Sequence, residues 1–271
     1  MPDAAADRAR PLVRVRGLKM HFPIYRGVLR RRAGEIRAVD DVSFDVMSGE
    51  TLGLVGESGC GKTTISRAVM GLVPATSGRI LFNGQEISGL SRKALRPFRR
   101  QMQYVFQDPF ASLNPVRSVG DLVGEPLRIH GLYDEMGGDA WVRRLFEMVG
   151  LSPSVANRLP REFSGGQKQR TALARALVRN PKVLILDDAL ASVDMHTSAQ
   201  IIEELRHATN GVGQRTSIIV SQRMAAVRHA DKIVVLNEGR IVEEGDHESL
   251  LALNGLYAEM YQREIQQAKE V

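Results

Sequence analysis

Two adjacent aspartates end a run of four apolar residues in the segment VLILDDALASVD, at residues 183–194. An aspartate at the carboxyl end of a buried strand lies where ligands of open α/β sheets bind. Asp187 is therefore a candidate Mg²⁺ ligand. Many nucleotide hydrolases carry a longer carboxylate in the next position, where it acts on the attacking water. Asp188 holds that position here, so the segment leaves open whether the protein hydrolyses a nucleotide or only binds one.

The segment GESGCGKT at residues 56–63 fits the pattern of a phosphate-binding loop. It follows a short expected strand, TLGLVG, and precedes a helix predicted over about residues 61–72. Glycines allow successive N–H groups to face a phosphate, and the helix N-terminus adds a partial positive charge. We expect Lys62 to reach the β- and γ-phosphates and the Thr63 hydroxyl to ligate Mg²⁺. The predicted nucleotide-binding residues of this segment are Gly56, Glu57, Ser58, Gly59, Cys60, Gly61, Lys62, Thr63 and Thr64.

A second helix N-terminus with anion-binding character is predicted in FSGGQKQRTALARAL, at residues 163–177. Ser164 is a favoured N-cap residue, and Gly165 and Gly166 leave the start of the helix bare. One nucleotide rarely needs two such sites from one chain. The economical arrangement is a dimer in which the second site of each chain covers the nucleotide of the other.

The composition indicates a soluble globular protein, with 43% hydrophobic and 25% charged residues among 271. No apolar run approaches the roughly 20 residues that cross a bilayer. Residues 1–16 are polar and Arg-rich, unlike a signal peptide, so we expect a cytosolic protein. The single Cys60 excludes an internal disulfide. It is either a tolerated small residue or a thiol whose alkylation would block nucleotide binding.

The positive charge is concentrated near the N-terminus. Residues 1–37 carry ten Lys/Arg and three acidic residues, a net +7, which leaves −1 for the remaining 234 residues of a chain with a total of +6. We interpret this arm as a solvated loop, with attraction to anionic lipid headgroups, at about 1 kcal/mol per basic residue, as the alternative. A nucleic-acid-binding body would spread Lys/Arg over one face, so no nucleic-acid partner is expected.

Apolar patterning predicts strands that alternate with helices, which indicates a mainly parallel α/β sheet. The segment RGVLRRRAGE (26–35) looks like a loop insertion between two of these strands. Residues 118–150 have helical periodicity. The last segment, from residue 255 to 271, is expected to pack onto the body. The predicted strands cover residues 12–16, 36–47, 51–56, 79–84, 102–107, 182–188, 217–222, 232–239 and 240–245.

In combination these motifs resemble the ATP-binding subunits of ABC transporters, from about residue 12 to residue 262. The matching motifs are GESGCGKTT as Walker A, Gln107 in YVFQDP as the Q-loop, FSGGQ as the signature, VLILD as Walker B and ASVD as the D-loop. The resemblance implies an α/β P-loop NTPase, with a RecA-like core, an antiparallel β subdomain and an inserted α-helical subdomain. The implied boundaries are 1–11 for a disordered basic arm, 12–108 and 164–250 for the core, 109–163 for the helical subdomain and 251–271 for a helical tail.

The resemblance also implies head-to-tail dimers that sandwich two ATP molecules with Mg²⁺. Gln107 would contact Mg²⁺, together with Thr63 and Asp187, and would couple the site to transmembrane permease subunits. An aromatic residue would stack on adenine. Phe22 is our choice, with Tyr25 second and core packing as the alternative role. Across the dimer, the nucleotide contacts would be Ser164, Gly165, Gly166, Gln167 and Asp194. The location implied is peripheral, at the cytoplasmic face of the membrane.

The two halves of the chain resemble different branches of this family. The N-terminal half resembles the second ATPase subunit of dipeptide/oligopeptide importers, whereas the chain from about residue 166 is more similar to exporter-type nucleotide-binding domains. A free-standing importer subunit and a recombined or engineered chain both fit this pattern. The other functions considered are an exporter-type domain, a chiefly regulatory ATP-binding subunit of a heterodimer, and a non-transport ABC ATPase acting on DNA or ribosomes.

Two positions depart from the family pattern. Asp188 replaces the glutamate that polarises the attacking water, and Gln222 replaces the histidine that holds the γ-phosphate. Because Asp is shorter than Glu by one methylene, its carboxylate should lie roughly 1 Å from the position that the attacking water requires. A displacement of this size can lower the rate of hydrolysis about a hundredfold. Gln222 can donate a hydrogen bond but cannot carry a positive charge. We therefore predict that this site binds ATP but hydrolyses it slowly or occludes it, with tolerated drift in a working homodimer as the alternative.

Overall fold

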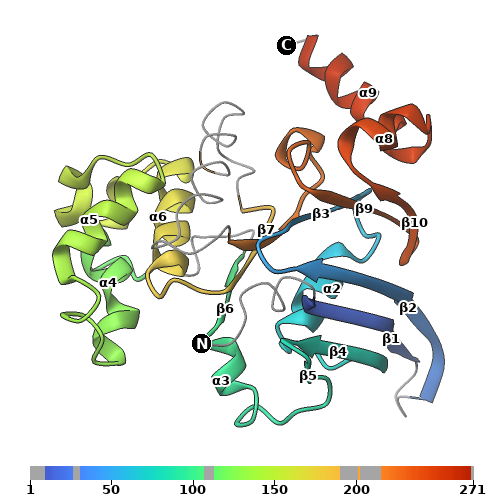
Figure 1. Cartoon of the computed structure of the whole chain (residues 1–271), viewed down its shortest axis with the longest axis horizontal. Helices are drawn as coiled ribbons and strands as arrows, with labels where there is room; N and C mark the ends of the chain where they lie inside the picture. Colours follow the sequence, from blue (N-terminus) through green and yellow to red (C-terminus); the bar gives the residue numbers. More distant parts are fainter. Residues whose placement is uncertain (1–9, 27–30, 107–112, 190–200, 202–214, 270–271) are drawn as a thin grey trace. The chain divides into compact units, whose positions relative to one another are not determined.

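The computed structural model describes residues 10–26, 31–106, 113–189, 201 and 215–269 (Figure 1). The chain divides into two compact units. The first unit comprises residues 1–98 and 218–271, and the second comprises residues 99–217. The predicted boundary of a separate helical subdomain at 109–163 differs from this division and stays a prediction. Most of the predicted basic arm, residues 1–9, lies outside the described residues.

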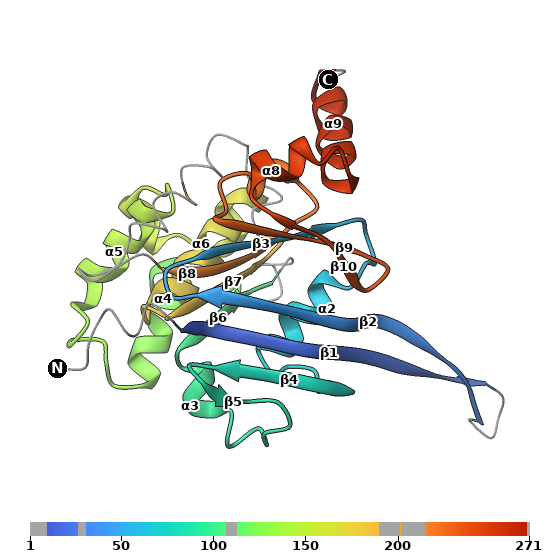
Figure 2. The same ribbon diagram turned by 45° about the vertical axis from the view of Figure 1, so that its right-hand side comes forward.

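An antiparallel sheet forms one part of the first unit, as predicted (Figure 2). Its strand order is β2-β1-β4-β5. Val13 of β1 pairs with Val46 on one side and with Phe82 on the other. All three of these side chains are buried, so this sheet has its own apolar face. The strands are β1 (Pro11–Arg26), β2 (Arg31–Met47), β4 (Ser77–Phe82) and β5 (Gln85–Glu86).

The prediction of a loop insertion at residues 26–35 is wrong for the part of this segment that the structure describes, which belongs to two strands. The first strand, predicted at 12–16, runs on to Arg26, and β2 already begins at Arg31, where it pairs with Arg26. The register shifts several times along this hairpin, for example between Val15 and Leu18. Each shift interrupts the two-residue alternation of side chains. The long strands are therefore hidden from a pattern analysis that depends on strict alternation.

Buried parallel strands carry the phosphate loop in the first unit. Strand β3 (Thr51–Gly56) is buried along its whole length and pairs in parallel with β9 (Lys232–Asn237). Antiparallel β10 (Arg240–Gly245) completes this part of the sheet. Helix α2 (Lys62–Val69) follows β3 and stops before Gly71, whose φ of 62° is left-handed. This confirms the predicted strand–loop–helix context.

Two helices, α8 (His247–Ala252) and α9 (Leu256–Lys269), follow β10 (Figure 1). Tyr257 near the start of α9 is fully buried. The N–H groups of Leu256 and Tyr257 donate to the Glu243 carboxylate at 2.5 and 3.0 Å. The prediction that the last segment packs onto the body is therefore confirmed for the start of α9.

The second unit combines two parallel strands with a group of helices. Strand β6 (Met102–Val105) pairs in parallel with β7 (Val183–Asp187), which confirms both predicted strands with shorter bounds. The described part of residues 109–163, which were predicted to be a helical subdomain, contains helices and no strand. Its elements are α4 (Val119–Ile129), α5 (Gly138–Met148), η2 (Pro153–Asn157) and η3 (Pro160–Glu162), and α6 (Gly165–Leu177) follows them. The short helix α3 (Arg96–Arg99) and strand β8 (Thr216–Val220) each include the point where the chain passes between units.

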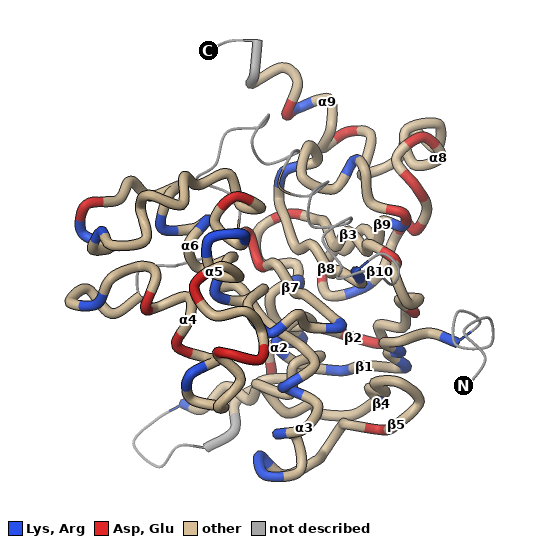
Figure 3. Tube along the Cα trace, turned by 60° about the vertical axis from the view of Figure 1, so that its left-hand side comes forward, with Lys and Arg blue, Asp and Glu red and all other residues tan. Residues whose placement is uncertain are grey.

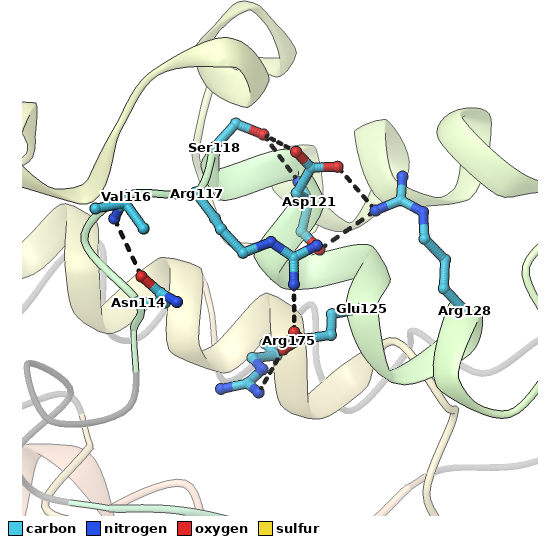
Figure 4. A network of polar contacts seen from close by, with 8 residues as sticks. All are labelled: Asn114, Val116, Arg117, Ser118, Asp121, Glu125, Arg128 and Arg175. Carbon is cyan, nitrogen blue, oxygen red and sulfur yellow. Dashed lines mark hydrogen bonds and ion pairs between the residues drawn. The ribbon is translucent and has the colours of Figure 1, made fainter.

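An ion-pair network joins α4 to α6 in the second unit (Figure 4). The Glu125 carboxylate accepts from Arg117, just before α4, and from Nη2 of Arg175 on α6 at 3.0 Å. Asp121 accepts from Nη1 of Arg128 at 2.9 Å within the same helix. Because Glu125 holds two guanidinium groups from different segments, it fixes α6 against α4.

Charge of both signs is interspersed along the described part of the chain (Figure 3). This agrees with the near-neutral body that the residue counts predict. Among the described residues, no helix is both long enough and apolar enough to cross a membrane.

Candidate nucleotide-binding site

Lys62 is held inside the phosphate loop at the first position of α2. Its Nζ donates to the carbonyl oxygens of Gly56 at 2.7 Å and Glu57 at 2.8 Å, and Sγ of Cys60 lies 3.5 Å away. The residue is only 5% exposed. The loop therefore curls around a buried ammonium group, and the contact of Lys62 with the β- and γ-phosphates stays a prediction.

The start of α2 can accept an anion. Its N-cap, Gly61, has a φ of 105° and provides no side-chain cap. The N-terminal N–H groups of a helix point outward along its axis, and together with the helix dipole they favour an anion such as phosphate. A Cβ atom at Gly61 would lie 2.3 Å from the carbonyl oxygen of Ala38. Only glycine fits this position, and the loop suits the phosphates of ATP.

The turn between β9 and β10 donates a hydrogen bond to the backbone of the phosphate loop. The N–H of Gly239 donates to the carbonyl oxygen of Cys60 at 3.1 Å, and its own carbonyl accepts from the N–H of Asp40 at 2.8 Å. Asp40 also accepts from Nη2 of Arg240 at 2.6 Å, and this contact lowers the pKa of the Asp40 carboxyl below its ordinary value. Cys60 is itself buried, so a bulky group on its sulfur would have to disturb this packing.

Phe22 lies on the hairpin that contacts the phosphate loop. It pairs across the strands with Ile36, two residues from Ala38, whose carbonyl oxygen abuts Gly61. Phe22 is 40% exposed and Tyr25 is 58% exposed. The alternative role of core packing does not describe either ring, and an exposed ring on this hairpin is available to stack on a base. Adenine stacking by Phe22 stays a prediction.

Gln222 follows β8 and is exposed. The N–H of the preceding Ser221 donates to the carbonyl oxygen of Leu54 at 3.2 Å. Leu54 belongs to β3, the strand that leads into the phosphate loop. Within the first unit, the segment that carries Gln222 therefore lies beside the strand that leads into the phosphate loop, and contact of Gln222 with the γ-phosphate stays a prediction.

Asp187 and Asp188 differ in their surroundings within the second unit. Asp187 is 1% exposed, and its Oδ2 accepts from the hydroxyl of Tyr104 at 2.6 Å. Asp188 is half-buried and has a φ of 46°. This left-handed conformation is uncommon for residues other than glycine, and Asp and Asn adopt it more readily than most. The backbone at this position therefore suits the shorter acidic residue.

Ser164 caps α6 with a reciprocal pair of hydrogen bonds. Its Oγ accepts from the N–H of Gln167 at 3.3 Å, and its own N–H donates to Oε1 of Gln167 at 3.0 Å. Ser164 is exposed, and Gly165 and Gly166 are half-buried. The predicted N-cap is confirmed. The predicted contact of these residues with a nucleotide on a second chain stays a prediction.

The remaining predicted site residues differ in their exposure. Gln107 and Asp194 lie outside the described residues. Glu57, Ser58 and Gly59 are exposed, whereas Thr63 and Thr64 are half-buried. Tyr104 and Gly239 were not among the residues predicted from the sequence. The signal for Tyr104 was its place near the end of an expected strand, because the ends of parallel strands share one edge of a sheet.

These features define a class. A glycine-rich loop between a buried parallel strand and a helix, with a buried lysine, identifies a P-loop nucleotide-binding protein. Residues 39–191 match the family described as ABC transporter. That match covers more than half of the chain, so the chain belongs to the ABC transporter family.

Curated relatives with similar sequences include two bacterial import or transport proteins. The glutathione import ATP-binding protein GsiA of Escherichia coli K12 is 47% identical over 236 residues, which are 87% of this chain and 38% of GsiA. The oligopeptide transport ATP-binding protein AppF of Bacillus subtilis 168 is 44% identical over 243 residues, which are 88% of this chain and 73% of AppF. The chain thus spans well under half the length of GsiA and about three quarters of AppF.

Solved structures confirm the fold. A bacterial Atm1-family ABC exporter with ATP bound has a TM-score of 0.74 and 32% identity, and the match covers 94% of this chain and 42% of the exporter chain. A dimeric ATP-binding cassette bound to ADP and phosphate has a TM-score of 0.75 and 26% identity, over 87% of this chain and 98% of that one. The chain therefore has the fold of an ABC-type ATP-binding cassette.

Each unit supplies an oxygen donor of the kind that Mg²⁺ prefers. Mg²⁺ is usually bound by one or two protein oxygens and the phosphates of the substrate. The Thr63 hydroxyl at the start of α2 and the buried Asp187 carboxylate at the end of β7 are oxygen donors of this kind. These residues come from different units, and their joint binding of Mg²⁺ stays a prediction.

Proposed function

We propose that the chain is the ATP-hydrolysing subunit of a peptide importer. In this assembly it forms a dimer with a second ATP-binding subunit and energises transmembrane permease subunits from the cytoplasmic face of the membrane. The observation that carries the proposal is the similarity to AppF, which extends over 88% of this chain at 44% identity. GsiA, whose name describes glutathione import, supports a small peptide as cargo.

Different residues of the chain have different roles in the proposed hydrolysis. The N–H groups at the start of α2 and the ammonium of Lys62 bind the phosphates and offset their charge. Mg²⁺, when bound, neutralises charge on the phosphate oxygens, and Thr63, Asp187 and Gln107 would hold it. Asp188 orients the attacking water and accepts its proton, and Gln222 donates a hydrogen bond to a γ-phosphate oxygen. Ser164, Gly165, Gly166, Gln167 and Asp194 complete the site on the partner subunit.

We further propose that the site built on this chain's own Walker motifs hydrolyses ATP slowly. General-base assistance contributes about 10²–10⁴ in rate, and Asp188 supplies it from a carboxylate that is one methylene short. Gln222 offers a neutral amide where a histidine could carry a positive charge. Neither change removes a phosphate contact of the loop, so ATP affinity is expected to be ordinary while turnover is low.

Measurement of steady-state ATPase turnover tests this proposal. The double variant Asp188→Glu/Gln222→His should increase kcat by about tenfold or more, because it restores a fully extended general base and a cationic hydrogen-bond donor. The KM for ATP should change little. Since φ of residue 188 is 46°, glutamate there costs on the order of 1 kcal/mol in stability, and thermal unfolding of the variant must be followed in parallel. A correctly folded double variant with no gain in kcat would refute the slow-site proposal and favour drift in a working homodimer.

A second candidate function is that of an exporter-type nucleotide-binding domain. It is favoured by the ATP-bound exporter structure, which matches 94% of this chain at 32% identity. Copurification of the full chain with its membrane partner separates the two functions. An importer subunit copurifies with separate permease chains and a second ATP-binding chain, whereas an exporter-type domain copurifies with one type of membrane chain.

A further inference from the structure

The short helix that follows Gln222 has a cap that comes from elsewhere in the chain. Helix η4 spans Met224–Ala226, and its N-cap residue, Arg223, provides no side-chain hydrogen bond. The N–H of Met224 instead donates to Oε2 of Glu264 on α9, at 2.6 Å and across 40 residues of sequence. Met224 is fully buried. Glu264 therefore anchors the backbone two residues beyond Gln222.

Helix α9 holds Glu264 firmly because its first turn is anchored to the same unit. The buried Tyr257 lies seven residues before Glu264, so the two side chains project from the same face of α9. The hydroxyl of Tyr257 is 2.7 Å from Nδ1 of His247, and the ring of Tyr261 lies edge-on to His247 with centroids 5.0 Å apart. A carboxylate on a helix that is anchored at its start can define the position of the segment that it caps.

The same turn of α9 also contacts the phosphate loop. Nη1 of Arg263 is 3.3 Å from Oε1 of Glu57, the residue after the first glycine of the loop. Both side chains are about 60% exposed, so this ion pair contributes little to stability. The ion pair nevertheless shows that this turn of α9 is a neighbour of the phosphate loop. The segment of α9 that includes Glu264 lies beside the phosphate loop and the Gln222 segment at once.

We propose that Glu264 is a positioning residue for Gln222. By capping η4 from α9, its carboxylate fixes the main chain that carries Gln222, and so places the Gln222 amide for the γ-phosphate. The inference rests on the proposed role of Gln222 in hydrolysis. It assigns a catalytic consequence to α9, a helix whose first turn is anchored to β10 and α8.

ATPase kinetics of the full chain test the proposal. Glu264→Ala should lower kcat about fivefold and leave the KM for ATP unchanged, since a displacement of roughly 1 Å can cost up to about a hundredfold in rate. Glu264→Gln should restore kcat to within about twofold of the parent, because its amide oxygen still accepts from the Met224 N–H. Gln266→Ala, at an exposed position on the same helix, is the matched control and should match the parent.

Two further measurements test whether Glu264 acts on kcat through η4 and Gln222. Amide exchange of residues 221–228 should become faster in Glu264→Ala, but not in Glu264→Gln or Gln266→Ala. In a Gln222→Ala background, Glu264→Ala should cause no additional loss of kcat, because a residue that acts through Gln222 has nothing left to position.

The outcomes separate this inference from the proposed function. If Gln222→Ala slows hydrolysis and Glu264→Ala does not, the positioning role is refuted and the proposed function stands. An additive loss in the double variant likewise refutes action through Gln222. If Gln222→Ala leaves kcat unchanged, the proposed role of Gln222 is wrong and the positioning role is overturned with it.

Discussion

Glycine at two positions of the phosphate loop illustrates how much one residue decides. Gly59 and Gly61 have φ values of 83° and 105°, so both conformations are strained for an alanine. A Cβ atom at Gly59 would meet nothing within 4 Å, whereas one at Gly61 would lie 2.3 Å from the Ala38 carbonyl oxygen. The two sites therefore separate backbone strain from steric collision within one loop.

We predict that Gly61→Ala is considerably more destabilising than Gly59→Ala. The strain common to both variants is of order 1–3 kcal/mol. Gly61→Ala must in addition displace the backbone of β2, so its midpoint of urea denaturation should fall clearly below that of Gly59→Ala. Unfolding of the nucleotide-free protein, followed by circular dichroism, measures both variants. Equal midpoints would show that the loop and β2 do not approach each other closely at Gly61.

Residue types alone predicted much of this site. The spacing within GESGCGKT predicted the loop, and the structure confirms the curled backbone around Lys62. The acceptor of the Tyr104 hydroxyl was not predictable, because Tyr104 and Asp187 are 83 residues apart. A contact of this kind depends on which strands become neighbours, and spacing along the chain does not carry that information.

At the scale of elements, two serine-capped helices of the second unit form a natural comparison. Ser164 caps α6 through the N–H of Gln167 at 3.3 Å, and Ser118 caps α4 through the N–H of Asp121 at 3.1 Å. Both serines precede a helix of ordinary length. Only Ser164 belongs to the signature motif that is proposed to contact a nucleotide on the partner subunit.

We predict that Ser164→Ala and Ser118→Ala each lower stability by about 1 kcal/mol, the usual cost of losing a serine cap. Only Ser164→Ala should also reduce ATPase turnover of the assembled dimer, by at least about tenfold, because it removes a donor for the transition-state phosphate. Urea denaturation and steady-state turnover measure the two effects. Equal turnover in both variants would restrict Ser164 to its capping role.

Elements differ in how well local patterns reveal them. The N-cap of α6 was predicted from FSGGQ because capping needs only neighbouring residues. The long hairpin β1–β2 was missed because its register shifts break the alternation between Val15 and His21. Helix α9 was expected to pack on the body, and the start of the helix does so. The hydrogen bond of Glu264 to the Met224 N–H could not be anticipated from an amphipathic stripe.

At the scale of the whole molecule, proton binding links the charge of the first unit to its stability. Arg240 donates a hydrogen bond to Asp40 and lowers the pKa of this carboxyl below its ordinary value of 3.8. The folded state therefore binds a proton at Asp40 less tightly than the unfolded state does. The stabilisation is fully present above about pH 4 and is lost as the pH falls through the folded pKa.

We predict that Asp40→Asn is less stable than the parent at pH 7 and that the difference shrinks as the pH is lowered below about 4. Asparagine keeps the shape of the side chain but cannot offer Arg240 a charged acceptor. Urea denaturation midpoints measured between pH 7 and pH 3 give the comparison. A difference that stays constant across this range would mean that Asp40 titrates alike in the folded and unfolded states.

The phosphate loop, the capped signature helix and the alternation of strands with helices follow from the chain alone, because each depends on residues within a few positions of one another. Three features appear only when the chain is folded. They are the division into two units, the contacts of Ala38 and Gly239 with the phosphate loop, and the cap that Glu264 places on η4. These contacts join residues that lie tens to almost two hundred positions apart. Burial and backbone hydrogen bonding select such partners, and the same local patterns are compatible with many other choices.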